Sequence, residues 1–526
     1  MMKKLKMCIF GMAVIPLTGM AALTENQELA LRDIDRCMTM VDAVWSHSIK
    51  GSGANIYLGD TYDLEGRGTS KGVSDVWPYT AVIEAHCSLL EALESAKDIA
   101  PELYEENYEK YVAQLDQLID NLEWYRGTYD LASYAVESKK VSPFGVHRGG
   151  SRGKAAVTGI ENVYDDQMWL ARELIRAYRL TGNEDYLDEA TYLTDYVLEG
   201  WDCWRDASGE EYGGITWGPG YNSKHACSNS PIIQPLVWLS EIYSPTEETV
   251  DYYFRDNDNA VVMETVKRGG HYLDFAKKVY AWQKKKLLHN SGCYWDMMGA
   301  DHGRIEVVDG YRQHVNNGGP TGNQYSYNTG TMIAGAAELY RVTGEDNYLA
   351  DLESTTRASL SQFAKYQRST GHYLFNTDDK ATEGFNSWFN DVLMRSYADA
   401  APFVESQYAA EGLKSFQYNL DYAFENYNDK DYLPIHFLDG WKGETVTKGF
   451  HQSAFASEYG VLAQWLISLD GDVEDTGVDK VGNDTVQGDD KVYTVGGIEK
   501  GSFNQVRDTL PRDIYIVGSK KVVCGK

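Results

Sequence analysis

The chain has 526 residues, 43% hydrophobic and 24% charged, a profile typical of a globular protein rather than a disordered or fibrous one. It carries 49 Lys plus Arg against 78 Asp plus Glu, a net charge of −29. This charge argues against nucleic acid and anionic membrane surfaces as partners, because phosphate binding needs clustered basic residues. The 38 Tyr and 13 Trp suit a neutral, ring-shaped ligand such as a sugar.

The amino terminus predicts a signal peptide over residues 1–21. Three lysines among residues 3–6 precede an apolar run over 7–17, and residues 19–21 (Gly-Met-Ala) supply the small residues of a cleavage site. The apolar run is shorter than the roughly 20 residues that a membrane span needs. We therefore expect an exported protein, periplasmic, secreted or on the cell surface, without membrane insertion.

The cysteines do not form the pattern of a disulfide framework. Six of them are scattered over the chain after residue 21, and Cys203 with Cys227 is the pair that best brackets one loop. The chain contains no CxxC, HExxH or EF-hand motif, so we predict no metal and no other cofactor.

Helical periodicity predicts twelve helices in two strictly alternating sets. Amphipathic, charged helices are expected over 28–48, 102–126, 184–200, 262–287, 346–368 and 404–427, and more apolar helices over 76–98, 164–180, 229–243, 327–343, 385–400 and 451–468. Helices that are apolar all round are buried, whereas those with a charged face lie outside. The alternation predicts an all-α (α/α)6 barrel over 22–470, six inner helices ringed by six outer ones, rather than three separate bundles.

One helix pair occurs twice. Residues 177–187 (AYRLTGNEDYL) match residues 339–349 (LYRVTGEDNYL), 162 positions further along the chain. Each copy predicts a helix end, a left-handed Gly cap and an acidic start to the next helix. Extended backward, the repeat aligns Asp165 and Asp166 with Tyr327 and Asn328, at equivalent helix starts.

The connections that lead into the inner helices are long. Those from inner to outer helices are mostly short, at 98–102, 180–184, 343–346 and 400–404, whereas those in the other direction cover 127–163, 201–228, 288–326 and 428–450. Long loops in compact domains are usually functional. The functional site is therefore expected at the end of the barrel where inner helices begin.

Acids, amides and aromatic rings gather at these inner-helix starts. Amides and carboxylates hydrogen-bond sugar hydroxyls, and rings cover the C–H faces of a sugar. Such residues are also good helix N-caps, so a capping role stays open for Asn328 and is favoured for Ser228 or Ser230. The predicted substrate contacts are Trp77, Tyr164, Trp169, Trp217, Asn229, Tyr327, Asn328 and Trp388.

Asp165 and Asp166 are the predicted catalytic pair. In a charged outer helix two such residues would merely complement the helix dipole, but here they open an apolar helix after a long loop. Glycoside hydrolysis needs one ionised and one protonated carboxyl group. The helix amino terminus favours ionisation of one, whose charge raises the pKa of the other. Their adjacency favours the short separation of retaining enzymes.

Residues 161–171 (ENVYDDQMWLA) contain YDD-x-x-W-x-A and resemble the signature of glycoside hydrolase family 76, the endo-α-1,6-mannanases. Residues 76–79 (VWPY), 213–217 (GGITW), 226–231 (ACSNSP) and 325–330 (YSYNTG) resemble further blocks of that family, in order, over residues 25–470. The resemblance implies retaining endo-hydrolysis of neutral α-1,6-mannan, with Asp165 as nucleophile and Asp166 as acid/base. Ser230 and Thr329 depart from the family's usual Gly and Gln, which leaves linkage and chain-length preference open.

Two other classes of function stay open. A non-catalytic, helical glycan-binding protein needs the aromatic cleft but neither aspartate. Another (α/α)6 enzyme, such as a uronyl hydrolase or lyase, handles anionic sugars and would carry Arg or Lys at several inner-helix starts, where this chain has amides and aromatic residues. Transglycosylation is not excluded either, and we expect a monomer.

The carboxy-terminal region differs in composition from the rest. A Gly-, Asp- and Val-rich linker is expected over 471–490 and a small β module over 491–526, with strands at 492–495, 514–517 and 521–523. The module resembles the carboxy-terminal module of exported Bacteroidetes-type proteins, which implies a sorting signal. A stabilising appendage is the alternative.

Overall fold

The computed structural model describes residues 22–66, 68–69, 72–299, 305–375, 385–404, 407–474, 491–494, 499–502, 513–517 and 520–524. The predicted signal peptide over 1–21 and residues 475–490 of the predicted linker lie outside this part. The chain divides into two compact units, one over 30–467 and one that combines 1–29 with 468–526.

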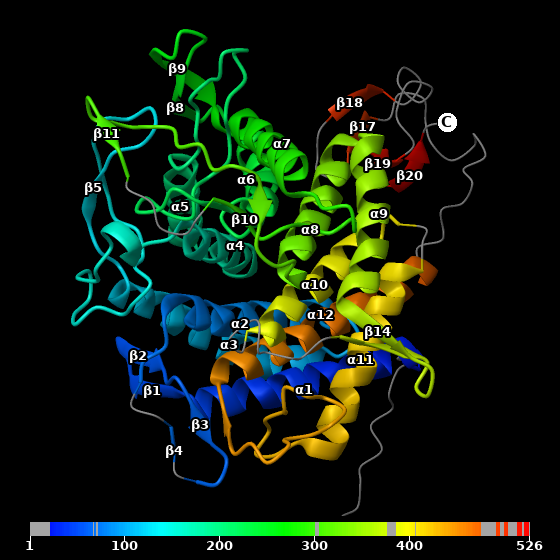
Figure 1. Ribbon diagram of the computed structural model, residues 1–526. Coiled ribbons are helices and arrows are strands. Elements are labelled where there is room, and N and C mark those ends of the chain that lie inside the picture. The colour runs from blue at the N-terminus through cyan, green and yellow to red at the C-terminus, as the bar shows by residue number, and fades with distance from the viewer. Residues whose placement is uncertain are drawn as a thin grey trace, which may run out of the picture. The chain divides into compact units, whose positions relative to one another are not determined.

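The larger unit is an (α/α)6 barrel, as predicted (Figure 1). Neighbouring inner helices pack against one another from α2 to α10, and α12 closes the ring through Ser457, 3.0 Å from Ser88 on α2, and His451, 2.6 Å from Ser387 on α10. The inner helices are α2 (Val76–Ser95), α4 (Tyr164–Thr181), α6 (Ile233–Tyr243), α8 (Ser326–Thr343), α10 (Asn386–Ala400) and α12 (Gly449–Glu474). The outer helices are α1 (Glu25–His47), α3 (Pro101–Asn121), α5 (Glu184–Leu198), α7 (Arg268–Leu287), α9 (Asp346–Phe363) and α11 (Tyr408–Tyr427).

Glycines set two features of this packing. Gly182 and Gly344 end α4 and α8 with φ of 70° and 67°, which confirms the left-handed caps of the predicted repeat. Gly330 lets α8 approach α10 closely, since a Cβ there would lie 2.9 Å from the backbone of Leu393. The close packing of α8 on α10 therefore depends on the missing side chain of Gly330.

The structure corrects two of the predicted outer helices. The helix expected over 262–287 begins at Arg268, and the segment before it is a hairpin of β8 (Thr249–Arg255) and β9 (Val261–Lys267). The helix expected over 346–368 ends at Phe363, and β14 (Ala364–Gln367) pairs with β15 (His372–Phe375). Both segments are rich in β-branched or aromatic residues, which favour a pleated, half-buried surface.

The long loops before the inner helices hold short antiparallel strands. These pair as β1 with β2, β3 with β4 and β16, β5 with β6, β10 with β7 and β13, and β11 with β12. Their bounds are β1 Ile49–Ser52, β2 Asn55–Leu58, β3 Tyr62–Asp63, β4 Gly68–Thr69, β5 Tyr129–Leu131, β6 Lys139–Val141, β7 Lys224–His225, β10 Met297–Met298, β11 Val307–Val308, β12 Tyr311–Arg312, β13 Pro320–Thr321 and β16 Val446–Thr447.

The carboxy-terminal strands form one antiparallel sheet in the order β18-β17-β19-β20. Three of them, β17 (Lys491–Thr494), β19 (Asp513–Val517) and β20 (Lys520–Cys524), match the expected strands, and β18 (Glu499–Ser502) was not expected. Helix α12 continues to Glu474, four residues into the stretch predicted as a linker. In the described part of the chain, no helix has the length and apolar character that crossing a bilayer requires.

Candidate active site

A cleft of about 810 Å³ opens at the end of the barrel where inner helices begin, as predicted. Its walls come from the starts of α2, α4, α8 and α10 and from three of the long loops. It is lined by Asp75, Trp77, Pro78, Val146, His147, Ile160, Glu161, Val163, Asp165, Asp166, Trp169, Trp217, Tyr221, His225, Cys227, Asp296, Met297, Gly322, Asn323, Tyr325, Tyr327, Phe385, Trp388 and Phe389.

Asp165 and Asp166 lie in the first turn of α4, and both line the cleft. The indole N–H of Trp217 donates to Oδ2 of Asp165 at 3.3 Å. Oδ1 of Asp165 accepts no hydrogen bond from the described residues. Asp166 is 7% exposed. Both side chains therefore lie in the wall of the cleft, and neither is sealed in the core or placed on the outer surface.

The two carboxyl groups have different electrostatic surroundings. Burial raises the pKa of Asp165 to about 6, and the Cys227 thiol, the Trp217 indole and the amides of the helix start hold it from rising further. Burial raises the pKa of Asp166 well above its usual range, and the charges of Asp165 and then Asp75 raise it more. Near neutral pH, Asp165 is therefore the ionised member of the pair and Asp166 the protonated one.

Aromatic rings form the floor of the cleft. The ring of Trp388 packs edge-on against Trp169 at 4.7 Å and against Trp77 at 5.1 Å between centroids. Tyr327 packs on Phe389 at 4.3 Å. Below the floor, the indole N–H of Trp388 donates to the buried Glu84 at 2.9 Å. Such a floor suits the C–H faces of sugar rings.

Five of the eight predicted substrate contacts line the cleft, namely Trp77, Trp169, Trp217, Tyr327 and Trp388. Tyr164, Asn229 and Asn328 do not. The ring of Tyr164 points away from the cleft to pack on Tyr196, 5.2 Å between centroids, and its side chain is buried. Nδ2 of Asn328, a fully buried residue, lies 3.4 Å from Asp296.

Asn229 belongs to a set of buried amides that clamp loop backbone. Its side chain accepts from Ile215 N at 2.8 Å and donates to Ile215 O at 2.9 Å. Gln167 binds both backbone groups of Phe144 in the same way, at 3.0 and 2.8 Å. Gln452 does so with Leu433, at 2.8 and 2.9 Å. At these three inner-helix starts the amide therefore anchors loop backbone rather than a ligand, and for Asn229 and Gln167 that loop lines the cleft.

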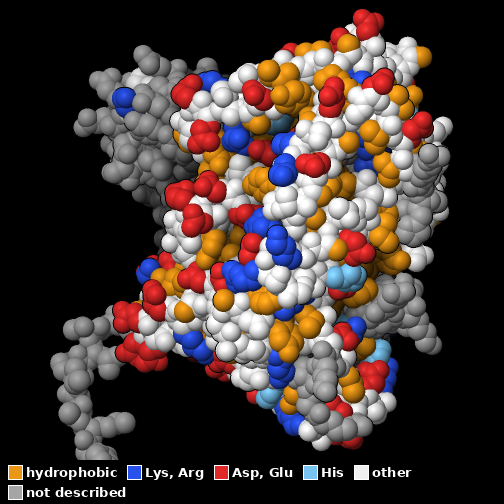
Figure 2. Space-filling model, turned by 90° about the vertical axis from the view of Figure 1, so that its left-hand side faces the viewer, with side chains coloured by type: hydrophobic (Ala, Val, Ile, Leu, Met, Phe, Trp, Pro, Cys, Tyr) orange, Lys and Arg blue, Asp and Glu red, His pale blue; other side chains and the backbone are white. Residues whose placement is uncertain are grey.

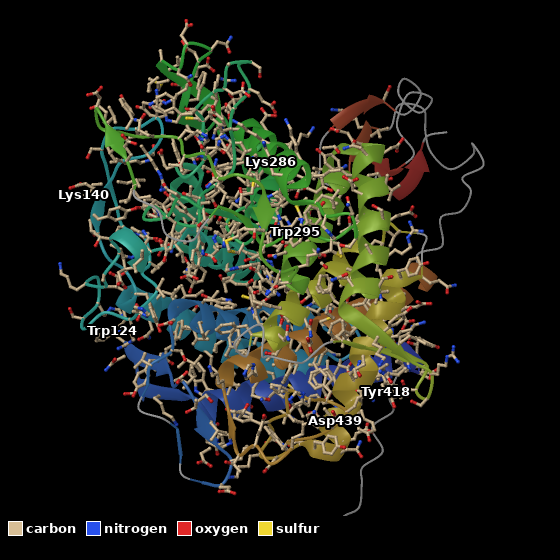
Figure 3. The ribbon with its side chains drawn as sticks, in the orientation of Figure 1. Trp124, Lys140, Lys286, Trp295, Tyr418 and Asp439 are labelled. Carbon is tan, nitrogen blue, oxygen red and sulfur yellow. The ribbon has the colours of Figure 1, made fainter. Side chains whose placement is uncertain are left out.

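Sequence reasoning missed several lining residues that come from the loops. Asp296 follows Trp295, which is labelled in Figure 3, and brings a further carboxyl group to the cleft, beside those of the predicted catalytic pair, Asp75 and Glu161. The ring of His225 stacks on Trp217 at 4.6 Å between centroids. Their only signal in the sequence was their place in the long loops 201–228 and 288–326.

The pairing considered for Cys203 and Cys227 is wrong. Both cysteines are free and buried, and Cys227 lies in the cleft wall beside Asp165. Burial raises the pKa of the Cys227 thiol well above its usual range, and the nearby charge of Asp165 raises it further. The thiol is therefore protonated and faces the carboxylate as a neutral group.

Among the described residues, the lining of the cleft contains neither Lys nor Arg. At one rim, Nδ1 of His147 lies 2.6 Å from Asp75. On the molecular face in Figure 2, acidic and basic side chains are interspersed over the described residues. No group of three or more His, Cys, Asp or Glu among the described residues has the geometry of a metal site. A cleft of this kind suits a neutral, hydroxyl-rich ligand.

A helical barrel whose aromatic cleft holds two adjacent carboxyl groups in unequal surroundings is typical of carbohydrate-active proteins, and the comparisons with known proteins identify the family. The family model described as glycosyl hydrolase family 76 matches residues 151–249 and 260–465. This chain belongs to glycosyl hydrolase family 76.

Curated relatives match part of the chain. A mannan endo-1,6-alpha-mannosidase of Candida albicans is 27% identical over 163 residues, 31% of this chain and 29% of the relative. Another, of Candida glabrata, is 25% identical over 226 residues, 42% of each chain. The aligned regions thus span less than half the length of these relatives.

Solved structures match over most of the chain. A family 76 mannosidase of Bacteroides thetaiotaomicron has a TM-score of 0.59 at 18% identity, covering 84% of this chain and 100% of that one. An inactive double variant of an α-1,6-mannanase of Salegentibacter sp., in complex with α-1,6-mannotriose, has a TM-score of 0.54 at 18% identity, covering 82% and 99%. At 18% identity, the likeness to these structures supports the fold of this chain and not its activity.

Proposed function

We propose that this protein is a retaining endo-α-1,6-mannanase in which Asp165 is the nucleophile and Asp166 the acid/base. The observation that carries this proposal is the unequal environment of two adjacent carboxyl groups facing one aromatic cleft. The curated relatives are named as mannan endo-1,6-alpha-mannosidases, and two inactive variants of the Salegentibacter mannanase each change two consecutive aspartates.

The proposed reaction begins with a mannosyl unit over the Trp388 floor. The indole N–H of Trp217 orients the Asp165 carboxylate through Oδ2, and this carboxylate attacks the anomeric carbon. Asp166 gives its proton to the departing glycosidic oxygen, and an oxocarbenium-like transition state leads to a mannosyl ester on Asp165. Asp166, now ionised, takes a proton from water, and the water cleaves the ester with net retention.

The described lining of the cleft, made of aromatic, amide and carboxyl side chains without Lys or Arg, favours a neutral polysaccharide over uronides. A cleft that is open at the end of the barrel suits internal linkages of a chain. The amino-terminal pattern supports export, and we propose that the carboxy-terminal sheet serves in sorting or anchoring of the exported protein.

Product analysis tests the reaction. The protein should release short oligosaccharides of several lengths from linear α-1,6-mannan, and the anomer first seen by NMR should be α. Asp165→Asn and Asp166→Asn should each lose about 10²-fold or more in kcat, whereas Asp98→Asn, at an exposed position next to the end of α2, should keep full activity. Products of β configuration, or full activity in either cleft variant, would contradict the proposal.

Azide distinguishes the two roles. When Asp166 is replaced by Ala, azide should intercept the mannosyl ester and give the α-mannosyl azide. When Asp165 is replaced by Ala, azide should instead attack the substrate directly and give the β-mannosyl azide. The reverse pairing of products would exchange the two assignments.

A further inference from the structure

The hairpin between α6 and α7 lies on the outside of the barrel, next to α7 (Figure 1). Its two strands pair over seven residue pairs, from Thr249 with Lys267 to Arg255 with Val261. Tyr252 packs on α7 through His271, 4.8 Å between ring centroids. The family model leaves out residues 250–259, so most of β8 and the tip of the hairpin lie outside the matched pattern.

The tip of this hairpin binds the loop that carries Trp217. Asn259 accepts a hydrogen bond from Arg205 N at 2.8 Å and donates one to Arg205 O at 3.1 Å. In return, Nε of Arg205 donates to the carbonyl oxygen of Arg255 at 2.8 Å. Asn259 adopts φ of 60°, a left-handed conformation that a turn of this kind requires. The contact is thus reciprocal and built from backbone as well as side chains.

Arg255, the last residue of β8, is 5% exposed and touches three of the cleft loops. Its Nε donates to the carbonyl of Tyr134 at 2.9 Å. Its guanidinium carbon lies 3.6 Å from the ring centroid of Trp204 and 5.2 Å from that of Tyr311. A buried cation is costly unless it is paired in this way, so these contacts fix where the three loops meet.

Arg312 continues the contact toward the cleft. Its carbonyl accepts the indole N–H of Trp204 at 2.9 Å. Its buried guanidinium donates to the carbonyls of Gly218 at 3.4 Å, Pro219 at 3.3 Å and Tyr221. Trp204 therefore lies between the two arginines, with its face toward Arg255 and its N–H toward Arg312. Those three carbonyls belong to the turn that directly follows Trp217.

That turn places the indole of Trp217. The ring of Trp217 packs on Tyr221 at 4.5 Å, and its backbone N–H donates to Ser223 O at 2.9 Å. Its carbonyl accepts from Tyr164 N, at the start of α4, at 2.8 Å. The series of contacts from the hairpin ends at the hydrogen bond from Trp217 to Asp165.

We propose that the β8–β9 hairpin is a clasp that holds the cleft loops so that Trp217 stays bonded to Asp165, with Arg255 and Asn259 as its positioning residues. The role given to Asp165 rests on the proposed function. A misplacement of catalytic groups by about 1 Å can cost about 10²-fold in rate, so a distant clasp has a measurable effect.

Two variants of the full chain test the clasp. Asn259→Gly keeps the left-handed backbone but removes both side-chain hydrogen bonds to Arg205. Arg255→Gln removes the cation from between the loops. Tyr253→Ala is the matched control, because it lies on the same strand with its side chain exposed. In both test variants, amide hydrogen exchange should become faster over residues 204–221 and 311–313, and kcat on α-1,6-mannan should fall about tenfold with KM changed much less. The control should match the wild type in both measurements.

Three outcomes would overturn the clasp: unchanged exchange over those two segments, exchange that becomes equally faster in the remote α9, or faster loop exchange with unchanged kcat. If Arg255→Gln does not fold, Asn259→Gly decides between these outcomes. The exchange measurement needs no substrate. If the wild type does not cleave α-1,6-mannan, the proposed function is refuted, and the exchange rates still test whether the hairpin holds the cleft loops.

Discussion

Replacing Trp217 with Phe isolates the hydrogen bond to the proposed nucleophile. Phe keeps an aromatic ring in the cleft wall but lacks the N–H that donates to Asp165 at 3.3 Å. This donor stabilises the ionised carboxylate, so its loss should raise the pKa of Asp165 above about 6. Since attack requires the ionised form, the activity should then fall off at a higher pH on the acid side.

The size of the shift follows from the bond. A hydrogen bond to a charged group contributes roughly 1.5–3 kcal/mol, and the length of this one places it at the lower end. One pKa unit corresponds to about 1.4 kcal/mol. The acid limb of the pH profile of kcat/KM should therefore move up by about one unit.

The assay is reducing-end release from linear α-1,6-mannan as a function of pH. Tyr221→Phe is the matched control, because it keeps the ring against Trp217 and loses only a hydroxyl that donates to Ile160 O at 3.3 Å. A uniform loss of activity with no movement of the acid limb would show that Trp217 acts only as a sugar platform. A shift of the acid limb to lower pH would refute the conclusion that the Trp217 N–H stabilises the ionised Asp165.

Three further substitutions test the barrel. Burial raises the pKa of Asp33 from 3.8 to about 7, so the native state favours the protonated form and loses stability as the pH rises through that range. In Asp33→Asn, the melting temperature should therefore fall less between pH 3.8 and about pH 7 than in the wild type. An equal fall in both proteins would contradict the raised pKa. Gly330→Ala places a Cβ 2.9 Å from the backbone of Leu393 and should lower the free energy of unfolding by about 1–3 kcal/mol in urea titrations, whereas no loss would mean that the helices separate freely. Trp388→Phe leaves the buried Glu84 without its indole donor and should cost about 1–3 kcal/mol by the same measurement; a variant as stable as the wild type would show that Glu84 finds another donor.

The barrel was predictable because burial leaves a periodic record in the sequence. Inner helices such as α2 and α8 are buried nearly all round, whereas outer helices such as α3 keep charged faces. The repeat ending at Gly182 and Gly344 fixed two helix boundaries through the left-handed cap. The hairpin over 249–267 was missed because its second strand runs directly into α7, so one continuous helix also fitted the pattern.

The site was predictable where chemistry and position coincide, as at Asp165 and Asp166. It was not predictable where a polar residue can serve either a ligand or the chain itself. Asn229 stands at an inner-helix start like a sugar-binding amide, yet its hydrogen bonds go to Ile215. The partner of such an amide lies in a loop far away in the sequence, and no local pattern records it. Asp296 was not predicted for the same reason, because it reaches the cleft from a loop.

The first and last helices of the barrel lie side by side, since Cys37 on α1 donates to Ala456 O on α12 at 3.0 Å and Arg36 lies 3.4 Å from the Tyr459 hydroxyl. Near the outer ends of the same two helices, Asn26 donates to Asp470 at 2.9 Å. At this seam, the described residues of the two helices are joined by non-covalent contacts. A short peptide across that seam, with new termini opened in the surface turn at 343–346, should give a circular permutant with the same arrangement of helices.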